Sequence, residues 1–144
     1  MLGHPVHPVL VHFPVALLLS ATIADLAYVS GLTQDTHIGA VLMAGGLAGG
    51  LLAMGAGMAD LVKLDQKLVP HAMMHASFVG LAWLGYGIAL YLRKDSLFAS
   101  NPLGGQAIAV SLVSAVVLAF GGWLGGRLVY TFGANVAARG PAGS

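Results

Sequence analysis

Histidine gives this chain most of its scope for chemistry, and the histidines are unevenly placed. The sequence holds six histidines, five acidic residues and no cysteine. Five of the histidines fall in two short segments, GHPVHPVLVHFP at 3–14 and PHAMMH at 70–75. Imidazoles bind metal ions and haem iron, and they exchange protons near neutral pH. These segments therefore suggest a redox cofactor, a metal ion or a proton relay.

The rest of the composition excludes most other classes of function. The lack of cysteine removes disulfides, thiolate metal sites, iron–sulfur ligation and thiol nucleophiles. A formal net charge of +1, with no Lys/Arg cluster among aromatic residues, argues against nucleic-acid binding. The sequence contains no nucleophile–base–acid set and no phosphate-binding glycine loop after a strand. We therefore assign no catalytic residues.

Hydropathy indicates a membrane protein. Hydrophobic residues make up 58% of the chain and charged residues 8%, whereas a soluble domain carries about 25% charged residues. Four apolar stretches, at 9–30, 38–61, 71–92 and 104–130, are each near the roughly 20 residues that cross hydrocarbon. Stretches of this length are helices rather than barrel strands. The sequence predicts an all-α, up-down bundle of four transmembrane helices over 1–133, with a flexible tail at 134–144.

An up-down bundle brings the two histidine segments to one side of the membrane, because the first and third helices both start there. The second and fourth helices end on that side. Five histidines, one aspartate and one arginine are thus predicted to gather at one leaflet: His4, His7, His12, His71, His75, Asp60 and Arg127. The remaining histidine, His37, is expected at the other side in an interfacial pair with Asp25.

His12 and His75 each lie about one turn inside their predicted helices, and therefore at matching depth. A b-type haem needs two axial imidazoles of this kind, from different helices. We therefore predict that His12 and His75 ligate haem iron. His7 and His71 would form a second, shallower pair or bond to a propionate, which Arg127 would neutralise. This arrangement indicates electron transfer with quinol or a partner redox protein.

Two other functions remain open. The set His4, His7, His71 and Asp60 suits a Cu, Fe or Zn ion, for binding or for transport. Methionines on nearby turns would suit Cu(I): Met54, Met58, Met73 and Met74. Alternatively, the chain is a cofactor-free anchor or assembly subunit of a larger complex.

Two glycine motifs, GGLAGG at 45–50 and GGWLGG at 121–126, repeat glycine at a spacing of four. Small residues at this spacing let membrane helices approach closely. The motifs predict tight packing within the bundle, a homo-oligomer through these faces, or room for a flat cofactor. Both halves of the chain open with His and Pro and continue into a double-glycine helix. The distances from His12 and from His75 to these motifs differ, so a duplication is only suggested.

The Lys and Arg residues indicate an orientation. The side with both termini carries Lys63, Lys67, Arg127 and Arg139, and the other side carries Arg93 and Lys94. Cytoplasmic loops are enriched in Lys and Arg. The sequence therefore predicts that both termini are cytoplasmic.

Four segments resemble the bacterial membrane family catalogued as domain of unknown function 2231. They are HPVHPVLVHFP at 4–14, AGMAD ending at Asp60, PHAMMH at 70–75 and GWLGGRLVYTFG at 122–133. The resemblance implies a four-helix protein of the bacterial inner membrane. Members stand alone or are fused to Rieske iron–sulfur or cytochrome c domains, which implies redox partners of these kinds. The family pattern marks His4, His7, His12, Asp60, His71, His75, Gly125, Gly126 and Tyr130.

The chain departs from the family pattern near its end. Arg127 stands where the family commonly has an acidic residue, and Thr131 and Phe132 replace an Arg-His pair. A metal-binding or proton-uptake role of that acidic residue is therefore in doubt here, and a propionate contact by Arg127 is favoured instead.

Overall fold

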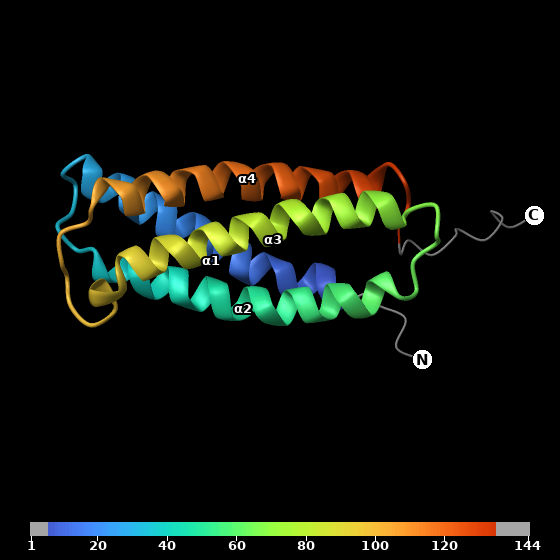
Figure 1. Cartoon of the computed structure of the whole chain (residues 1–144), viewed down its shortest axis with the longest axis horizontal. Helices are drawn as coiled ribbons and strands as arrows, with labels where there is room; N and C mark the ends of the chain where they lie inside the picture. Colours follow the sequence, from blue (N-terminus) through green and yellow to red (C-terminus); the bar gives the residue numbers. More distant parts are fainter. Residues whose placement is uncertain (1–5, 135–144) are drawn as a thin grey trace, which may run out of the picture.

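Four long helices account for most of the described chain. The computed structural model describes residues 6–134, with the four helices running up and down beside one another (Figure 1). They are α1 (Val6–Val29), α2 (His37–Leu61), α3 (Val69–Leu92) and α4 (Gly105–Tyr130), with a short 3-10 helix η1 (Lys94–Leu97) after α3. All four are long and apolar enough to cross a membrane. The predicted all-α, four-span bundle is confirmed, and the predicted tail falls, apart from Ala134, outside the described residues.

The bundle has two chemically different ends. α1 and α3 start, and α2 and α4 finish, at the right-hand end of Figure 1, which we call the histidine end. The connections 30–36 and 93–104 lie at the opposite end. Gly31 allows the chain to leave α1, because its φ of 76° is in the left-handed region that glycine favours. The N–H of Leu32 then donates to the carbonyl of Ala27 at 3.0 Å.

Glycines bring the helices of each hairpin into close contact. α1 packs along α2, and α3 packs along α4 (Figure 1). A Cβ at Gly46 of α2 would lie 2.7 Å from the Leu18 side chain of α1, and a Cβ at Gly121 of α4 would lie 2.9 Å from Val79 of α3. The glycine motifs therefore allow close packing of the helices inside the bundle, which was one of the three predictions for them.

Apolar side chains cover the outside of the bundle as well as its core. Fully buried core residues include Leu18, Met43 and Tyr86. Large apolar residues are also exposed along the helices, among them Ile23, Leu52 and Val116. Helices that are apolar all round belong in lipid or in a large core, and four helices leave most of this surface to the bilayer.

Candidate functional site

Two histidines from different helices lie close together at the histidine end. His7 is in the first turn of α1 and His75 is in the second turn of α3. Both side chains are partly buried. Their ring centroids are 6.4 Å apart, and the ring planes are inclined by 77°. The structure thus joins one histidine from each of the two histidine segments.

A backbone carbonyl fixes each of these rings. Nδ1 of His7 is 2.8 Å from the carbonyl oxygen of Ala53 on α2, and Nδ1 of His75 is 2.7 Å from that of Gly121 on α4. A carbonyl oxygen only accepts hydrogen bonds, so Nδ1 carries the proton and donates in both rings. In a neutral imidazole, Nε2 then holds the free lone pair, which is the state that binds a metal.

A glycine lies against each of the two rings. A Cβ at Gly57 of α2 would come within 3.1 Å of the His7 ring, and one at Gly125 of α4 within 2.8 Å of the His75 ring. Both distances are shorter than ordinary van der Waals contact. Gly57 and Gly125 therefore make the space that the imidazoles occupy.

The surroundings of the two histidines repeat with one offset. The matched residues, each 68 positions apart, are His7 with His75, Ala53 with Gly121, and Gly57 with Gly125. In both halves the histidine bonds to a carbonyl 46 residues later. Helices α2 and α4 also begin 68 residues apart. The hairpins 6–61 and 69–130 therefore repeat the same contacts around their histidines, at an offset of 68 residues.

Of the two predicted haem ligands, His12 and His75, only His75 takes part in this close pair. His12 is exposed on the outer surface of α1 and does not join His75. His12 follows His7 by five residues, which is a rotation of about 140° around a helix. Only one of the two can face the bundle, and that one is His7. The comparison of the two halves changes as well: His75 corresponds to His7, and not to His12 as the sequence suggested.

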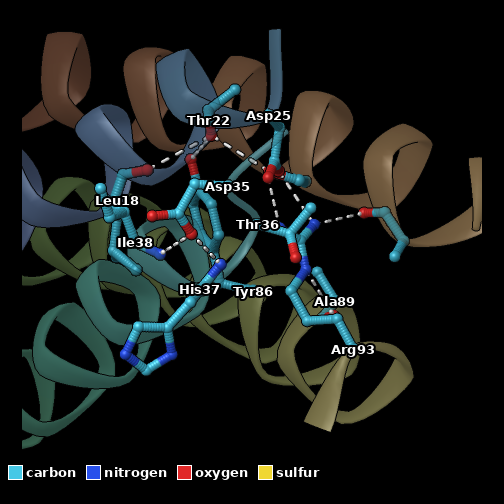
Figure 2. Close-up of polar contacts among 12 residues, drawn as sticks. Leu18, Thr22, Asp25, Asp35, Thr36, His37, Ile38, Tyr86, Ala89 and Arg93 are labelled. Atoms are coloured by element: carbon cyan, nitrogen blue, oxygen red, sulfur yellow. Dashed lines mark hydrogen bonds and ion pairs between the residues drawn. The ribbon is translucent and has the colours of Figure 1, made fainter. Parts of the chain in front are cut away.

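An ion pair joins the same two helices at the opposite end. The side chains of Asp25 on α1 and Arg93 after α3 are 1% and 0% exposed. Nη1 of Arg93 donates to Oδ1 of Asp25, and Nη2 donates to Oδ2 at 2.9 Å (Figure 2). Arg93 also donates to the carbonyl oxygens of Ala89 and Ala107, each at 3.2 Å. Both buried charges are thus compensated by hydrogen bonds.

The predicted pairing of Asp25 with His37 is wrong. Nδ1 of His37 lies 2.9 Å from the carbonyl oxygen of Ser96 instead. Hydropathy did not predict Arg93 as the partner of Asp25, because Arg93 falls in the polar connection after the apolar stretch 71–92. A signal was present: Arg93 follows His75 by 18 residues, as Asp25 follows His7, and 18 residues make about five helical turns.

Hydroxyl groups from three helices meet in the core next to the ion pair. Oγ1 of Thr22 is 2.7 Å from the Tyr86 hydroxyl and 3.2 Å from the Ser111 hydroxyl. Thr22 also lies 3.2 Å from the carbonyl oxygen of Leu18, to which its hydroxyl donates (Figure 2). All three hydroxyl side chains are buried. This network joins α1, α3 and α4 through satisfied polar groups.

Two further predicted site residues lie apart from the His7–His75 pair. The exposed His71 packs its ring 4.5 Å from the ring of Phe132. The Arg127 guanidinium lies 5.1 Å from the centroid of Trp123 and 5.9 Å from that of Phe132. Arg127 follows Gly125 by two residues, a rotation of about 200° around α4. Its backbone position therefore faces away from the His75 ring, and the structure gives it no contact with the pair.

The members of the predicted metal-binding set that the structure describes, His7, His71 and Asp60, do not form a cluster. His4 lies outside the described residues. Within 6–134 the structure forms no group of three or more His, Cys, Asp or Glu side chains that could hold an ion. Asp60 is partly buried near the end of α2. Three of the four methionines proposed for Cu(I) are exposed: Met58, Met73 and Met74. In the described part of the chain, the site is a pair of histidines rather than a cluster.

Four helices that are long and apolar enough to cross a membrane define the class of this molecule as an integral membrane protein. Two histidines from different helices lie close together at one end of its bundle. A family described as predicted membrane proteins, DUF2231, matches residues 3–138. The chain belongs to this family, as its histidine segments and the motif at 122–133 indicated. The comparison with curated proteins and the comparison with solved structures each found no match.

Proposed function

We propose that the protein binds one haem b between His7 and His75 and transfers electrons within the membrane. One observation carries the proposal: the ring centroids of two imidazoles from different helices lie 6.4 Å apart, and each imidazole has its Nδ1 bonded to a backbone carbonyl. This pairing favours Nε2 ligation from both sides. It replaces the pair of His12 and His75 that the sequence suggested.

The spacing of the rings suits one metal atom between them. A metal–imidazole bond is about 2.0–2.1 Å long and the ring centre lies about 1.1 Å behind the nitrogen. Two imidazoles on opposite sides of one metal atom therefore have centroids about 6.3 Å apart. The centroids of His7 and His75 are 6.4 Å apart.

The number of protein ligands favours haem over a bare ion. Zinc sites take three or four protein ligands, whereas a porphyrin supplies four ligands to iron and leaves two axial positions. The described residues provide two histidines and no third ligand beside them. A pair of histidines thus matches the requirement of a haem.

The chain's own groups orient the ligands. When bound, haem would supply reversible one-electron transfer, and His7 and His75 would hold its iron. The carbonyls of Ala53 and Gly121 accept hydrogen bonds from the two Nδ1 atoms and so fix the tautomer and the orientation of each ring. Gly57 and Gly125 let the rings seat against α2 and α4. The apolar surface of the bundle limits the access of water.

We place the histidine end at the cytoplasmic face of the bacterial inner membrane. Lys63, Lys67 and Arg127 are exposed at or near this end. At the opposite end Arg93 is buried against Asp25, which leaves Lys94 as the exposed cation among the described residues there. The excess of Lys and Arg favours the histidine end as the cytoplasmic one. A quinol dissolved in the bilayer, or a Rieske or cytochrome c protein, is the proposed redox partner.

An absorption spectrum tests the proposal directly. Protein purified from a haem-replete host should show a Soret band, and sharp α and β bands after reduction with dithionite. The His7→Ala and His75→Ala variants should lose the low-spin spectrum. His12→Ala should keep it, and this variant is the matched control because it lies on the same helix but faces outward.

Other outcomes would overturn the proposal. A colourless protein that takes up no added haemin would exclude haem binding. Near-stoichiometric Cu, Zn or Fe without porphyrin, lost in His75→Ala, would indicate a metal-binding protein instead. Loss of the spectrum in His12→Ala, with His7→Ala unaffected, would show that the wrong pair has been assigned.

A further inference from the structure

The ion pair and the histidine pair stand on the same faces of the same two helices. His7 and Asp25 are 18 residues apart in α1, and His75 and Arg93 are 18 residues apart along α3 and its C-cap. At about 100° per residue, 18 residues complete about five turns and span about 27 Å. Each helix therefore presents a histidine at one end and a charged partner at the other, along one line.

We propose that Asp25 and Arg93 are positioning residues, which set the rotation and the axial register of α1 against α3 so that His7 and His75 meet. The inference deepens the proposed function. It rests on that function only for the reason why His7 and His75 come together, which is to hold a haem. The bidentate contact orients both partners in a single geometry, and Arg93 is further held by the carbonyls of Ala89 and Ala107.

A polar contact of this kind is useful because apolar contacts specify the rotation and the axial position of a helix only weakly. α1 is apolar on its outer as well as its inner face, with Val9, Phe13 and Ile23 exposed. A rotated or shifted α1 would still bury apolar side chains. A slip by one turn, however, would move Asp25 about 5.4 Å away from Arg93 and leave two unpaired charges in the core. The ion pair therefore disfavours the wrong settings, in addition to the packing of Leu18 against Gly46.

The internal repeat predicts that the ion pair can be reversed. Arg93 bonds to the carbonyls of Ala89 and Ala107. The residues 68 positions earlier are Ala21, one helical turn before Asp25, and Gly39. A Cβ at Gly39 would be 3.2 Å from Oδ1 of Asp25 and 3.7 Å from the carbonyl oxygen of Ala21. An arginine at position 25 would thus find equivalent acceptors, and an aspartate at position 93 would face it.

The rate of cross-linking reports how close position 7 of α1 lies to position 75 of α3, and the measurement needs no cofactor. The chain has no cysteine, so His7→Cys with His75→Cys provides the two thiols for a short bis-maleimide in native membranes. His12→Cys with His75→Cys is the control pair. Each pair is combined with Asp25→Arg alone, and with the reversal Asp25→Arg plus Arg93→Asp.

With the ion pair intact, cross-linking of positions 7 and 75 should be fast, and that of 12 and 75 slow. Asp25→Arg should slow the 7–75 cross-link about tenfold or more, because two buried cations replace a pair. The reversal should restore it to within about twofold. In the histidine-containing protein, the low-spin spectrum should be lost and restored in the same order.

Three results would overturn the inference. In the first, positions 7 and 75 would cross-link as fast in Asp25→Arg as in the parent. In the second, the reversal would fail to restore the rate of this cross-link although the protein has normal helical content. In the third, Asp25→Arg would insert into the membrane but lose both the 7–75 and the 12–75 cross-links together with its helical content. That result would show general unfolding rather than a change in the rotation or register of α1. Failure of haem binding with an intact cross-linking pattern would remove the proposed function and leave the positioning role in place.

Discussion

Arg93 forms its ion pair with Asp25, the residue that occupies the same place 68 positions earlier in the first hairpin. The two partners of the ion pair are thus matched residues of the two hairpins, as His7 and His75 are. The matched residues that meet are alike at the histidine end of the bundle and oppositely charged at the other end. Opposite charges in equivalent positions favour the pairing of the first hairpin with the second over the pairing of two identical hairpins.

Replacing Gly125 by alanine should disrupt the histidine pair. The added Cβ would lie 2.8 Å from the His75 ring and would push it away from the Gly121 carbonyl. We expect loss of the low-spin haem spectrum with unchanged helical content by circular dichroism. Gly126→Ala is the control, because a Cβ there meets nothing within 4 Å. Equal spectra for both variants would contradict the role given to Gly125.

Tyr86→Phe should destabilise the bundle without altering the histidine end. The variant loses the hydrogen bond of 2.7 Å between Tyr86 and Thr22 in the core. One buried hydrogen bond contributes about 1 kcal/mol to the free energy of unfolding. Thermal unfolding in detergent should show this loss for Tyr86→Phe and none for Tyr91→Phe, whose side chain is 71% exposed. Identical unfolding temperatures would count against the hydroxyl network.

The connection before α2 should lose stability in acid. The Ser100 hydroxyl and the N–H of His37, both donating to Asp35, hold the pKa of the Asp35 carboxyl below its ordinary value of 3.8. A pKa that is lower in the folded state means that the carboxylate stabilises the fold above pH 3.8, and that this contribution disappears as the pH falls through the lowered value.

The variant Asp35→Asn isolates this effect, because an amide oxygen still accepts from the Ser100 hydroxyl and from the N–H of His37 but does not titrate. Its unfolding temperature should start lower at neutral pH and change less than that of the native protein between about pH 5 and pH 2. Parallel pH profiles for the two proteins would show that Asp35 does not contribute in this way.

Labelling of single cysteines should report the orientation. Gln66 lies in the connection between α2 and α3, and Ala99 lies in the connection before α4; both are exposed. Ser96, in the same connection as Ala99, is buried and is unsuitable. An impermeant maleimide applied to intact cells should react with Ala99→Cys, and with Gln66→Cys only after permeabilisation. The reverse pattern would place the histidine end outside, and equal reaction would contradict four spans.

The sequence alone was enough to predict the four helices and their common up-down course. Each helix is a long apolar stretch with a polar connection on either side, and a bilayer admits few other structures for such a stretch. The gathering of His7, His75 and Arg127 at one end also followed from the order of the spans. These features depend on hydropathy and chain order, which are written along the sequence itself.

Only the tertiary structure decided which side chains meet. His7 and His12 differ in direction by about 140°, and the choice between them depends on how α1 is rotated in the bundle. Sequence periodicity does not reveal that rotation, because apolar residues surround each helix. Packing of Leu18 against Gly46 and pairing of Asp25 with Arg93 set the rotation instead. These are contacts between residues far apart in the chain, and they turn His7 toward His75 and His12 toward the outside.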